Sequence, residues 1–177
     1  MKRVVFLTAA FCLLSLAAFA QDKPADYSGT WNLDISKSKL DERSRIESMK
    51  LTVTQTEKDI TVVPETKRQA PPDGGMGRGG RAGLGGDSTL TYSLDGKETK
   101  TALASAMGTV PVTLKATSAG GKLTLTSTRT FNTQMGEMTM TTKEVWSLSA
   151  DGKTLTVERE QQTPRGTNAA THVFTKQ

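Results

Sequence analysis

The sequence predicts an all-β protein, an antiparallel up-and-down meander barrel of about 8–10 strands with one short helix after the first strand. Apolar and polar residues alternate with period two along most of the chain, which is the pattern of strands that bury one face. Turn dipeptides separate the alternating runs and favour two-residue hairpins. Trp31, near the start of the first run, indicates a barrel that closes its first strand on its last. The strongest turn signals are Asp95-Gly96, Gly120-Gly121 and Asp151-Gly152.

About ten strands are expected, and their short connections predict that neighbouring strands pair antiparallel. The single helix is expected from about Lys39 to Ser48, where Asp41 and Glu42 fall in the first turn and Ile46 and Met49 form a short apolar stripe. The strands are expected near 29–35, 49–56, 59–66, 87–94, 97–103, 110–118, 122–133, 137–149, 153–162 and 169–176.

Residues 1–20 have the pattern of a signal peptide, with a basic start, an apolar run and a small-x-small end at Ala18-Phe19-Ala20. We therefore expect a periplasmic or secreted protein with no membrane span after cleavage, an N-terminal extension at 21–28 and one barrel domain at 29–177. The only cysteine, Cys12, lies inside the apolar run, so the mature chain would have no disulfide.

The charge of the chain is mild. Removing Lys2 and Arg3 with the signal peptide lowers the formal net charge from +5 to +3. A nucleic-acid-binding protein carries a concentrated basic surface instead, so nucleic acid is not an expected partner. We expect a monomer whose charge serves solubility.

A glycine-rich segment at 71–87 interrupts the strand pattern and cannot pack a core. It is expected to be a disordered insertion in one hairpin loop. The alternative is a flap over the barrel mouth, with Arg78 and Arg81 attracting an anionic ligand.

The hairpin turns fix which side chains share a face of the sheet. A turn at Asp151-Gly152 sets Trp146 opposite Val157 and Glu144 opposite Arg159, and a turn at Met135-Gly136 sets Arg129 opposite Thr142. In these strands Leu, Met, Phe and Trp share one face and threonines line the other, so the apolar face is the interior.

Three charged residues fall on this interior face: Arg129, Glu144 and Arg159. Glu144 is expected across from Arg159 and diagonal to Arg129, within reach of long side chains. Two cations around one anion leave a net positive charge, which favours an anionic guest such as a carboxylate. The alternative is a self-satisfied structural network, or residues near the rim that water reaches.

The last strand places His172, Phe174 and Lys176 on one face by the same alternation. If it pairs antiparallel with the first strand, Lys176 lies close to Trp31, where a cation over an indole ring is favourable. We therefore expect Gly29, Trp31 and Lys176 to form the barrel closure. The expected ligand-binding residues are Arg129, Glu144, Arg159, Trp146, His172 and Phe174.

The segment Tyr27-Ser28-Gly29-Thr30-Trp31-Asn32-Leu33 resembles the Gly-x-Trp opening of the calycin superfamily, the lipocalins and fatty-acid-binding proteins. The expected ten strands resemble those of the fatty-acid-binding branch. The export signal resembles that of the lipocalins and their bacterial relatives. The resemblance implies a barrel that binds a small hydrophobic ligand. The Arg-x-Tyr pair that holds a ligand carboxylate in fatty-acid-binding proteins is replaced here by His172 and Phe174, and the usual pair of helices by about 14 residues.

The expected function is therefore an exported lipocalin-like barrel that binds a small hydrophobic ligand, favourably an anionic one, in its interior. One alternative is an envelope scaffold or interaction protein with a filled core. Another is a haem- or copper-binding barrel that uses His172 or the run Met135, Met138 and Met140. We expect no enzyme activity, no cofactor and no metal site, because the sequence has no cysteine after the leader and one histidine.

Overall fold

The computed structural model describes residues 25–41, 44–69, 87–105, 108–133 and 136–177. The predicted signal peptide at 1–20, residues 21–24 of the N-terminal extension, and residues 71–86 of the glycine-rich segment with Arg78 and Arg81 lie outside the described residues. The strands are β1 (Gly29–Leu33), β2 (Ile46–Gln55), β3 (Asp59–Arg68), β4 (Leu90–Ser93), β5 (Thr99–Ser105), β6 (Gly108–Ala119), β7 (Lys122–Thr133), β8 (Gly136–Leu148), β9 (Thr154–Thr163) and β10 (Gly166–Lys176).

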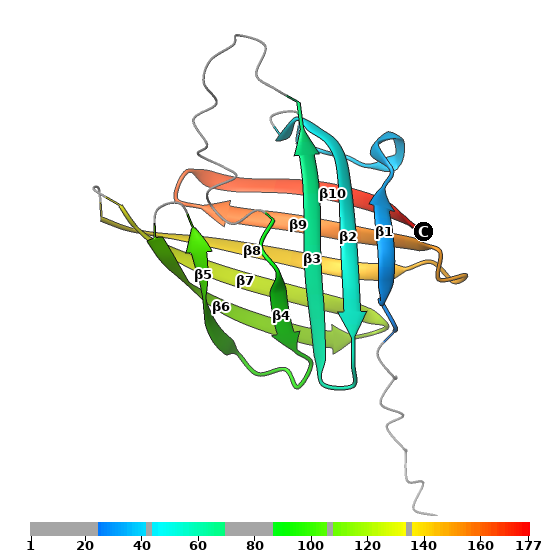
Figure 1. Cartoon of the computed structure of the whole chain (residues 1–177), viewed down its shortest axis with the longest axis horizontal. Helices are drawn as coiled ribbons and strands as arrows, with labels where there is room; N and C mark the ends of the chain where they lie inside the picture. The colour runs from blue at the N-terminus through cyan, green and yellow to red at the C-terminus, as the bar shows by residue number, and fades with distance from the viewer. Residues whose placement is uncertain (1–24, 42–43, 70–86, 106–107, 134–135) are drawn as a thin grey trace, which may run out of the picture.

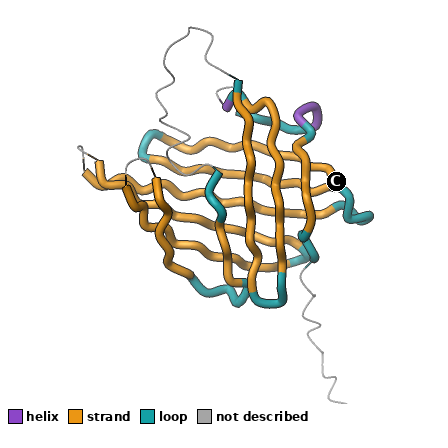
Figure 2. The backbone as a smooth tube through the Cα atoms, viewed as in Figure 1, coloured by secondary structure: helices purple, strands orange, loops and turns teal. Residues whose placement is uncertain are grey.

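The ten strands form one antiparallel sheet in the order β4-β3-β2-β1-β10-β9-β8-β7-β6-β5, which confirms the predicted all-β meander barrel. The first strand pairs with the last, as expected. In the described residues the ladder is interrupted between β4 and β5, so the barrel is nearly closed. Figure 1 shows β1 to β3 crossing over the layer that contains β6 to β10, and Figure 2 shows how much of the described backbone is strand.

The predicted helix at Lys39–Ser48 is wrong in position. The 3-10 turn η1 (Ile35–Lys37) lies before this range. Within the range, Ser44 is a 3-10 residue whose amide donates to the Asp41 carbonyl oxygen at 2.8 Å, and β2 already begins at Ile46. A β-bulge at the start of β2 explains the misleading pattern, because Ile46 pairs with Arg68 while Ser48 pairs with Lys67. The extra residue, Glu47, puts Ile46 and Met49 on the same face of a strand at a spacing of three, which resembles helical periodicity.

The register derived from the turn at Asp151-Gly152 is observed. Glu144 lies opposite Arg159 and Trp146 opposite Val157, as the turn at Asp151-Gly152 requires. The turn at Gly120-Gly121 likewise sets Ser127 opposite Leu114.

The register derived from the turn at Met135-Gly136 is wrong by two residues. Arg129 lies opposite Met140, not Thr142, because Thr133 pairs with Gly136. Gly136 is the first residue of β8, so it follows the turn and is not one of its two central residues. Its φ of +106° is a backbone conformation that glycine adopts readily. A shift of two residues keeps every side chain on its face, so Arg129 stays in the interior.

The seam between β1 and β10 closes the barrel. Trp31 pairs with Lys176, and the Lys176 Nζ lies 5.1 Å from the centroid of the Trp31 ring system. At an exposed site such a cation–π contact stabilises by about 0.5–1 kcal/mol. Gly29 has φ +132°, and a Cβ there would lie 2.7 Å from the Lys176 Cε. Glycine is thus required at this position both by the backbone and by the lysine that crosses it.

Aromatic side chains close the end of the barrel below this seam. Tyr27, Trp31 and Trp146 are among the most deeply buried residues. The Trp31 Nε1 donates to the Tyr27 carbonyl oxygen at 2.9 Å, and the Tyr27 hydroxyl donates to the Trp146 carbonyl oxygen at 3.2 Å. The Tyr27 and Trp146 rings meet edge to face, with centroids 5.8 Å apart. The last residues of the predicted N-terminal extension therefore pack as part of the barrel.

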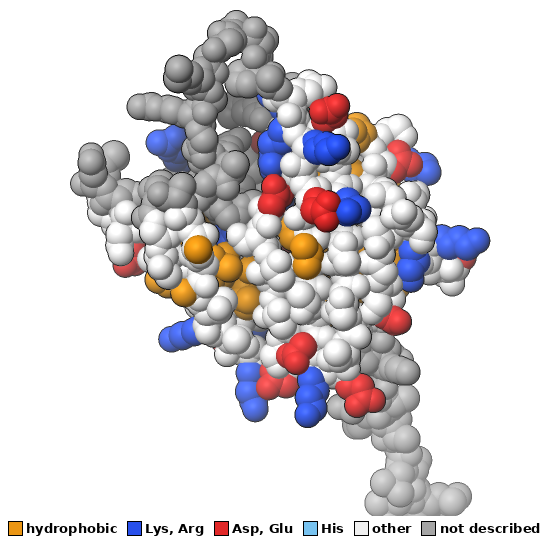
Figure 3. Space-filling view, in the orientation of Figure 1, with side chains coloured by type: hydrophobic (Ala, Val, Ile, Leu, Met, Phe, Trp, Pro, Cys, Tyr) orange, Lys and Arg blue, Asp and Glu red, His pale blue; other side chains and the backbone are white. Residues whose placement is uncertain are grey.

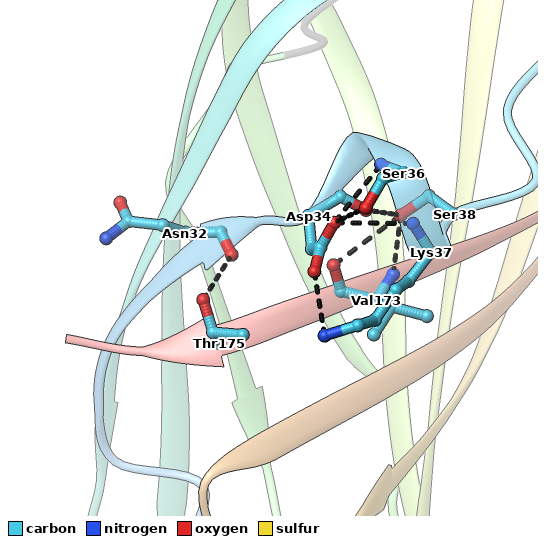
Figure 4. A network of polar contacts seen from close by, with 7 residues as sticks. All are labelled: Asn32, Asp34, Ser36, Lys37, Ser38, Val173 and Thr175. Carbon is cyan, nitrogen blue, oxygen red and sulfur yellow. Dashed lines mark hydrogen bonds and ion pairs between the residues drawn. The ribbon is translucent and has the colours of Figure 1, made fainter.

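The chain after β1 stays attached to β10 through the turn at η1 (Figure 4). Asp34 caps this turn, since its Oδ1 accepts from the Ser36 and Lys37 amides at 3.1 and 3.3 Å. Its Oδ2 lies 3.0 Å from the Lys37 Nζ. The Val173 amide donates to the Ser38 Oγ at 2.9 Å, so a side chain continues the β1–β10 ladder where the backbone turns away.

These contacts lower the pKa of Asp34 to about 2, the hydrogen bond from Ser36 being the largest cause. A lowered carboxyl pKa stabilises the folded state above the unfolded pKa near 4, and this contribution is lost as the pH falls toward 2. We predict that Asp34→Asn, which can still cap the turn, flattens the loss of unfolding free energy between pH 4 and pH 2. Denaturant unfolding at several pH values measures it.

Asp59→Asn is the matched control, because it removes one negative charge from an exposed position at the start of β3. An Asp34→Asn protein whose stability falls with pH as steeply as that of the wild type and the control would contradict the assigned role of the carboxylate.

Candidate ligand-binding site

A cavity of about 70 Å³ lies inside the barrel. Its walls include Met49, Pro64 and Leu90, which lie on β2, β3 and β4 toward the ends remote from the β2–β3 turn. Val157 and Phe174 supply apolar surface from β9 and β10. The cavity is well below the roughly 300 Å³ at which pockets for drug-sized ligands begin.

Glu144 is the centre of the polar wall. One carboxylate oxygen, Oε2, accepts from the Trp146 Nε1 at 3.0 Å, and the other, Oε1, lies 3.8 Å from the Arg159 Nε. The alternation of β8 places Glu144 and Trp146 on the same face, two residues apart, and the β8–β9 register brings Arg159 across. The Glu144 and Arg159 side chains are 25% and 33% exposed, so water reaches this pair and screens it.

Arg129 reaches the same cavity from β7. Burial lowers the pKa of its guanidinium, and the nearby positive charge of Arg159 lowers it further, while Tyr92 and Glu144 act in the opposite direction. Arginine nevertheless remains protonated at neutral pH. The cavity wall thus carries two guanidinium groups and one carboxylate.

Tyr92 on β4 is part of this wall and was missed by the sequence reasoning. It is buried, and burial together with the charge of Glu144 raises the pKa of its phenol, which keeps the phenol neutral. Its hydroxyl shares a hydrogen bond with Ser127, another buried polar residue of the wall. The alternation of Leu90, Thr91 and Tyr92 does mark the ring as inward-facing. The long β3–β4 connection gave no turn from which to place it.

His172 and Phe174 lie side by side on β10, with ring centroids 6.2 Å apart. Burial lowers the pKa of His172, and Arg159 lowers it further, against a smaller opposite effect of Glu144. The imidazole is therefore neutral at neutral pH and supplies one donor and one acceptor.

The structure thus brings the predicted ligand-binding residues together. The lining of this one cavity includes all six of them: Arg129, Glu144, Arg159, Trp146, His172 and Phe174. Its lining does not include Gly29, Trp31 or Lys176, which lie at the β1–β10 seam. Arg129 is not diagonal to Glu144 as expected. The β7–β8 register sets Leu125 opposite Glu144 and Arg129 opposite Met140, which places Arg129 four residues along β7 from the residue that faces Glu144.

Metal ligands do not gather in the described part of the chain, where no group of three or more His, Cys, Asp or Glu residues could hold an ion. Met138 and Met140 pack against the hydrophobic core, and Met135 lies outside the described residues. Among the described residues there is also no helix with the length and apolarity needed to cross a membrane. On the face seen in Figure 3, acidic and basic side chains are interspersed.

Comparison with known proteins gives few relatives. No family model matches the chain, and no curated protein matches it. A similar solved structure is the crystal structure of zebrafish ileal bile acid-binding protein complexed with cholic acid, at 15% sequence identity and a TM-score of 0.49. The match covers 85% of this chain and 98% of that chain.

The fold is calycin-like on its own topology. All neighbouring strands are antiparallel, the first strand pairs with the last, and the sheet order is interrupted once in the described chain, between two consecutive strands. The Gly-x-Trp segment lies at the closing seam, where Trp31 faces Lys176.

The lowered pKa of His172 has a consequence for stability. In the unfolded chain the imidazole takes up a proton near pH 6.5, whereas in the folded chain it stays neutral to lower pH. The unfolded state then binds more protons, so stability falls as the pH drops below about 6.5. We predict that His172→Gln removes this part of the pH dependence and that the His172 ring signals titrate below pH 6.5 in NMR spectra.

Because His172 is the only histidine of the chain, its ring signals need no further assignment. A ring that titrates at or above pH 6.5 would contradict the neutral, buried state.

Proposed function

We propose that this protein is an exported, periplasmic or secreted monomer that binds a small ligand with an apolar part and an anionic group inside its barrel. The observation that carries the proposal is the composition of the cavity wall, where Arg129 and Arg159 share the lining with one carboxylate, Glu144, within an otherwise largely apolar interior. Charged groups inside a barrel are costly unless they are compensated or hydrated. An anionic guest would balance the excess positive charge.

Both oxygens of Glu144 are already engaged in the wall, one by a hydrogen bond from Trp146 and the other by an ion pair with Arg159 at 3.8 Å. An added anion would therefore share the guanidinium donors, which suit the planar, two-oxygen shape of a carboxylate. The apolar part of the ligand would lie against Val157, Phe174 and Leu90.

We propose binding rather than catalysis. The wall holds one carboxylate, so the pair of carboxylates that acid–base hydrolysis uses is not formed there. His172 is the single histidine of the chain and lies beside Phe174, within electrostatic range of Arg159 and Glu144.

A second candidate is a filled-core scaffold or interaction protein, and the cavity volume favours it. About 70 Å³ is small beside the roughly 300 Å³ at which pockets for drug-sized ligands begin. In this alternative, the charged residues form a hydrated structural network and nothing but water occupies the cavity.

NMR of the indole groups separates the two candidates. The Trp146 indole N–H binds Glu144 in the cavity wall, while the Trp31 indole N–H binds the Tyr27 carbonyl at the closed end and serves as an internal reference. We predict that at least one carboxylate, from a series of sodium salts of increasing chain length, shifts the Trp146 signal saturably and leaves Trp31 unchanged. Arg129→Gln and Arg159→Gln should each weaken that binding about tenfold, or about 1.4 kcal/mol.

Lys143→Gln is the matched control, because this lysine neighbours Glu144 in the sequence but lies on the outer face opposite Glu160. It removes a positive charge and should leave the binding constant unchanged. A Trp146 signal that no carboxylate shifts would favour the filled core. Equal losses in all three variants would indicate a net-charge effect without a specific site.

A further inference from the structure

We propose that the ligand lies in the cavity with its apolar end at the buried base and its carboxylate at the solvent-exposed opening, so that its head group continues into water. The class of ligand then includes amphiphilic acids with a polar head group larger than a carboxylate, such as N-acyl amino acids. This orientation rests on the proposed function and specifies the class of ligand. It follows from how burial and charge change along the strands that line the cavity.

The cavity becomes more exposed in one direction along β8 and β9. On β8, Trp146 is 1% exposed, whereas the side chain of the next inward residue, Glu144, is 25% exposed. On β9, Val157 is 3% exposed, whereas the side chain of the next inward residue, Arg159, is 33% exposed. Both steps lead away from the turn that joins the two strands. The charged pair therefore lies at the opening, and the apolar side chains lie at the base.

The strands β2 and β4 line another side of the cavity and show the same change. On β4, Tyr92 is buried and the next inward residue, Leu90, is half-buried, as is Ser88 just before the strand. On β2, Leu51 is buried and the next inward residue, Met49, is half-buried. The cavity therefore opens to solvent beside Ser88 and Leu90 as well as beside the charged pair of β8 and β9.

The charges of the lining lie toward the opening. Arg129, Glu144 and Arg159 are each partly exposed, while the buried lining residues His172 and Tyr92 are neutral at pH 7 for the reasons given above. A carboxylate at the base would therefore lie against apolar side chains without a cation, which is costly. At the opening it has guanidinium donors and water.

The base of the cavity suits an alkyl chain. Leu125, Val157 and Phe174 are almost fully buried there and present apolar surface from three strands. Each methylene group that leaves water at this surface strengthens binding by about fourfold at full burial. Burial and charge thus favour the same orientation, since the apolar end gains most at the base and the carboxylate loses least at the opening.

Three probes with the same carbon chain distinguish the two orientations. They are octanoate, N-octanoylserine, which extends the head group, and octanedioate, which adds a carboxylate at the other end of the chain. We expect N-octanoylserine to bind within about threefold of octanoate, because contacts of a solvated head group contribute little. Octanedioate should bind about tenfold more weakly or worse, because its second carboxylate would be buried at the base. With the carboxylate at the base, this order would be reversed.

The measurement is a titration at pH 7.5 and constant ionic strength, followed by the Trp146 indole signal with Trp31 as reference. The orientation of bound octanoate is read separately from the relaxation that a soluble gadolinium chelate causes in its protons. We expect the methylene group next to the carboxylate to relax faster than the terminal methyl group, because the chelate reaches only solvent-exposed atoms.

A charge placed at the opening tests the position of the carboxylate in the protein. Ser88→Glu adds a negative charge to the cavity lining and should weaken octanoate binding about fivefold by repulsion. Thr89→Glu is the matched control, because it adds the same charge at the exposed neighbouring residue, which is not part of the lining. Neither residue is buried, so both variants are expected to fold. Equal affinities in the two variants would contradict a carboxylate at the opening.

Failure of the orientation and failure of the proposed function give different results. If octanedioate binds as tightly as octanoate, or if N-octanoylserine binds more than about tenfold more weakly, the orientation is overturned while the proposed function stands. A terminal methyl group that relaxes faster than the methylene group next to the carboxylate also overturns it. If none of the three probes shifts Trp146, the orientation and the binding of an amphiphilic carboxylate both fail.

Discussion

The pairing of β1 with β10 is the constraint on which the rest of the structure depends. It turns a ten-stranded meander into a nearly closed barrel, so that the apolar faces of the strands surround an interior instead of facing solvent. Three local features serve this seam: the left-handed backbone at Gly29, the Lys176 ammonium over the Trp31 ring, and the Ser38 hydroxyl that extends the ladder. Because the barrel is nearly closed, the inward-facing side chains must be apolar, or their charges and polar groups must be paired or hydrated.

The two ends of the barrel interior differ in how their space is filled and how their polar groups are compensated. At the end near Gly121, aromatic rings fill the space, and the polar atoms of Tyr27 and Trp31 bind backbone carbonyl oxygens. Farther along the strands, charged side chains surround a small cavity, and the partial exposure of Glu144 and Arg159 reduces the cost of holding them there. A barrel with only a structural task needs no cations at such inward positions, and this is why the proposed function is assigned to the polar end.

Much of the fold could be predicted because alternation and tight turns act locally. The turn at Asp151-Gly152 was enough to set Glu144 against Arg159. Prediction failed where a single residue changed the alternation of a strand or the position of a turn. The bulge at Glu47 gave an apolar spacing that resembles a helix, and Gly136 follows the turn in which it was expected to lie. Tyr92 was missed because its strand follows a long connection, and the cavity volume could not be predicted since it depends on how side chains from several strands pack together.

The central claim is that the positive excess inside this barrel serves to hold an anion. A crystal structure at atomic resolution of the protein in sodium acetate, beside one in a medium without carboxylates, tests it most directly. The account predicts acetate in the cavity, with its oxygens at about 2.7–2.9 Å from guanidinium nitrogens of Arg129 and Arg159. A cavity that holds the same ordered waters in both crystals, with acetate absent from it, would contradict the account.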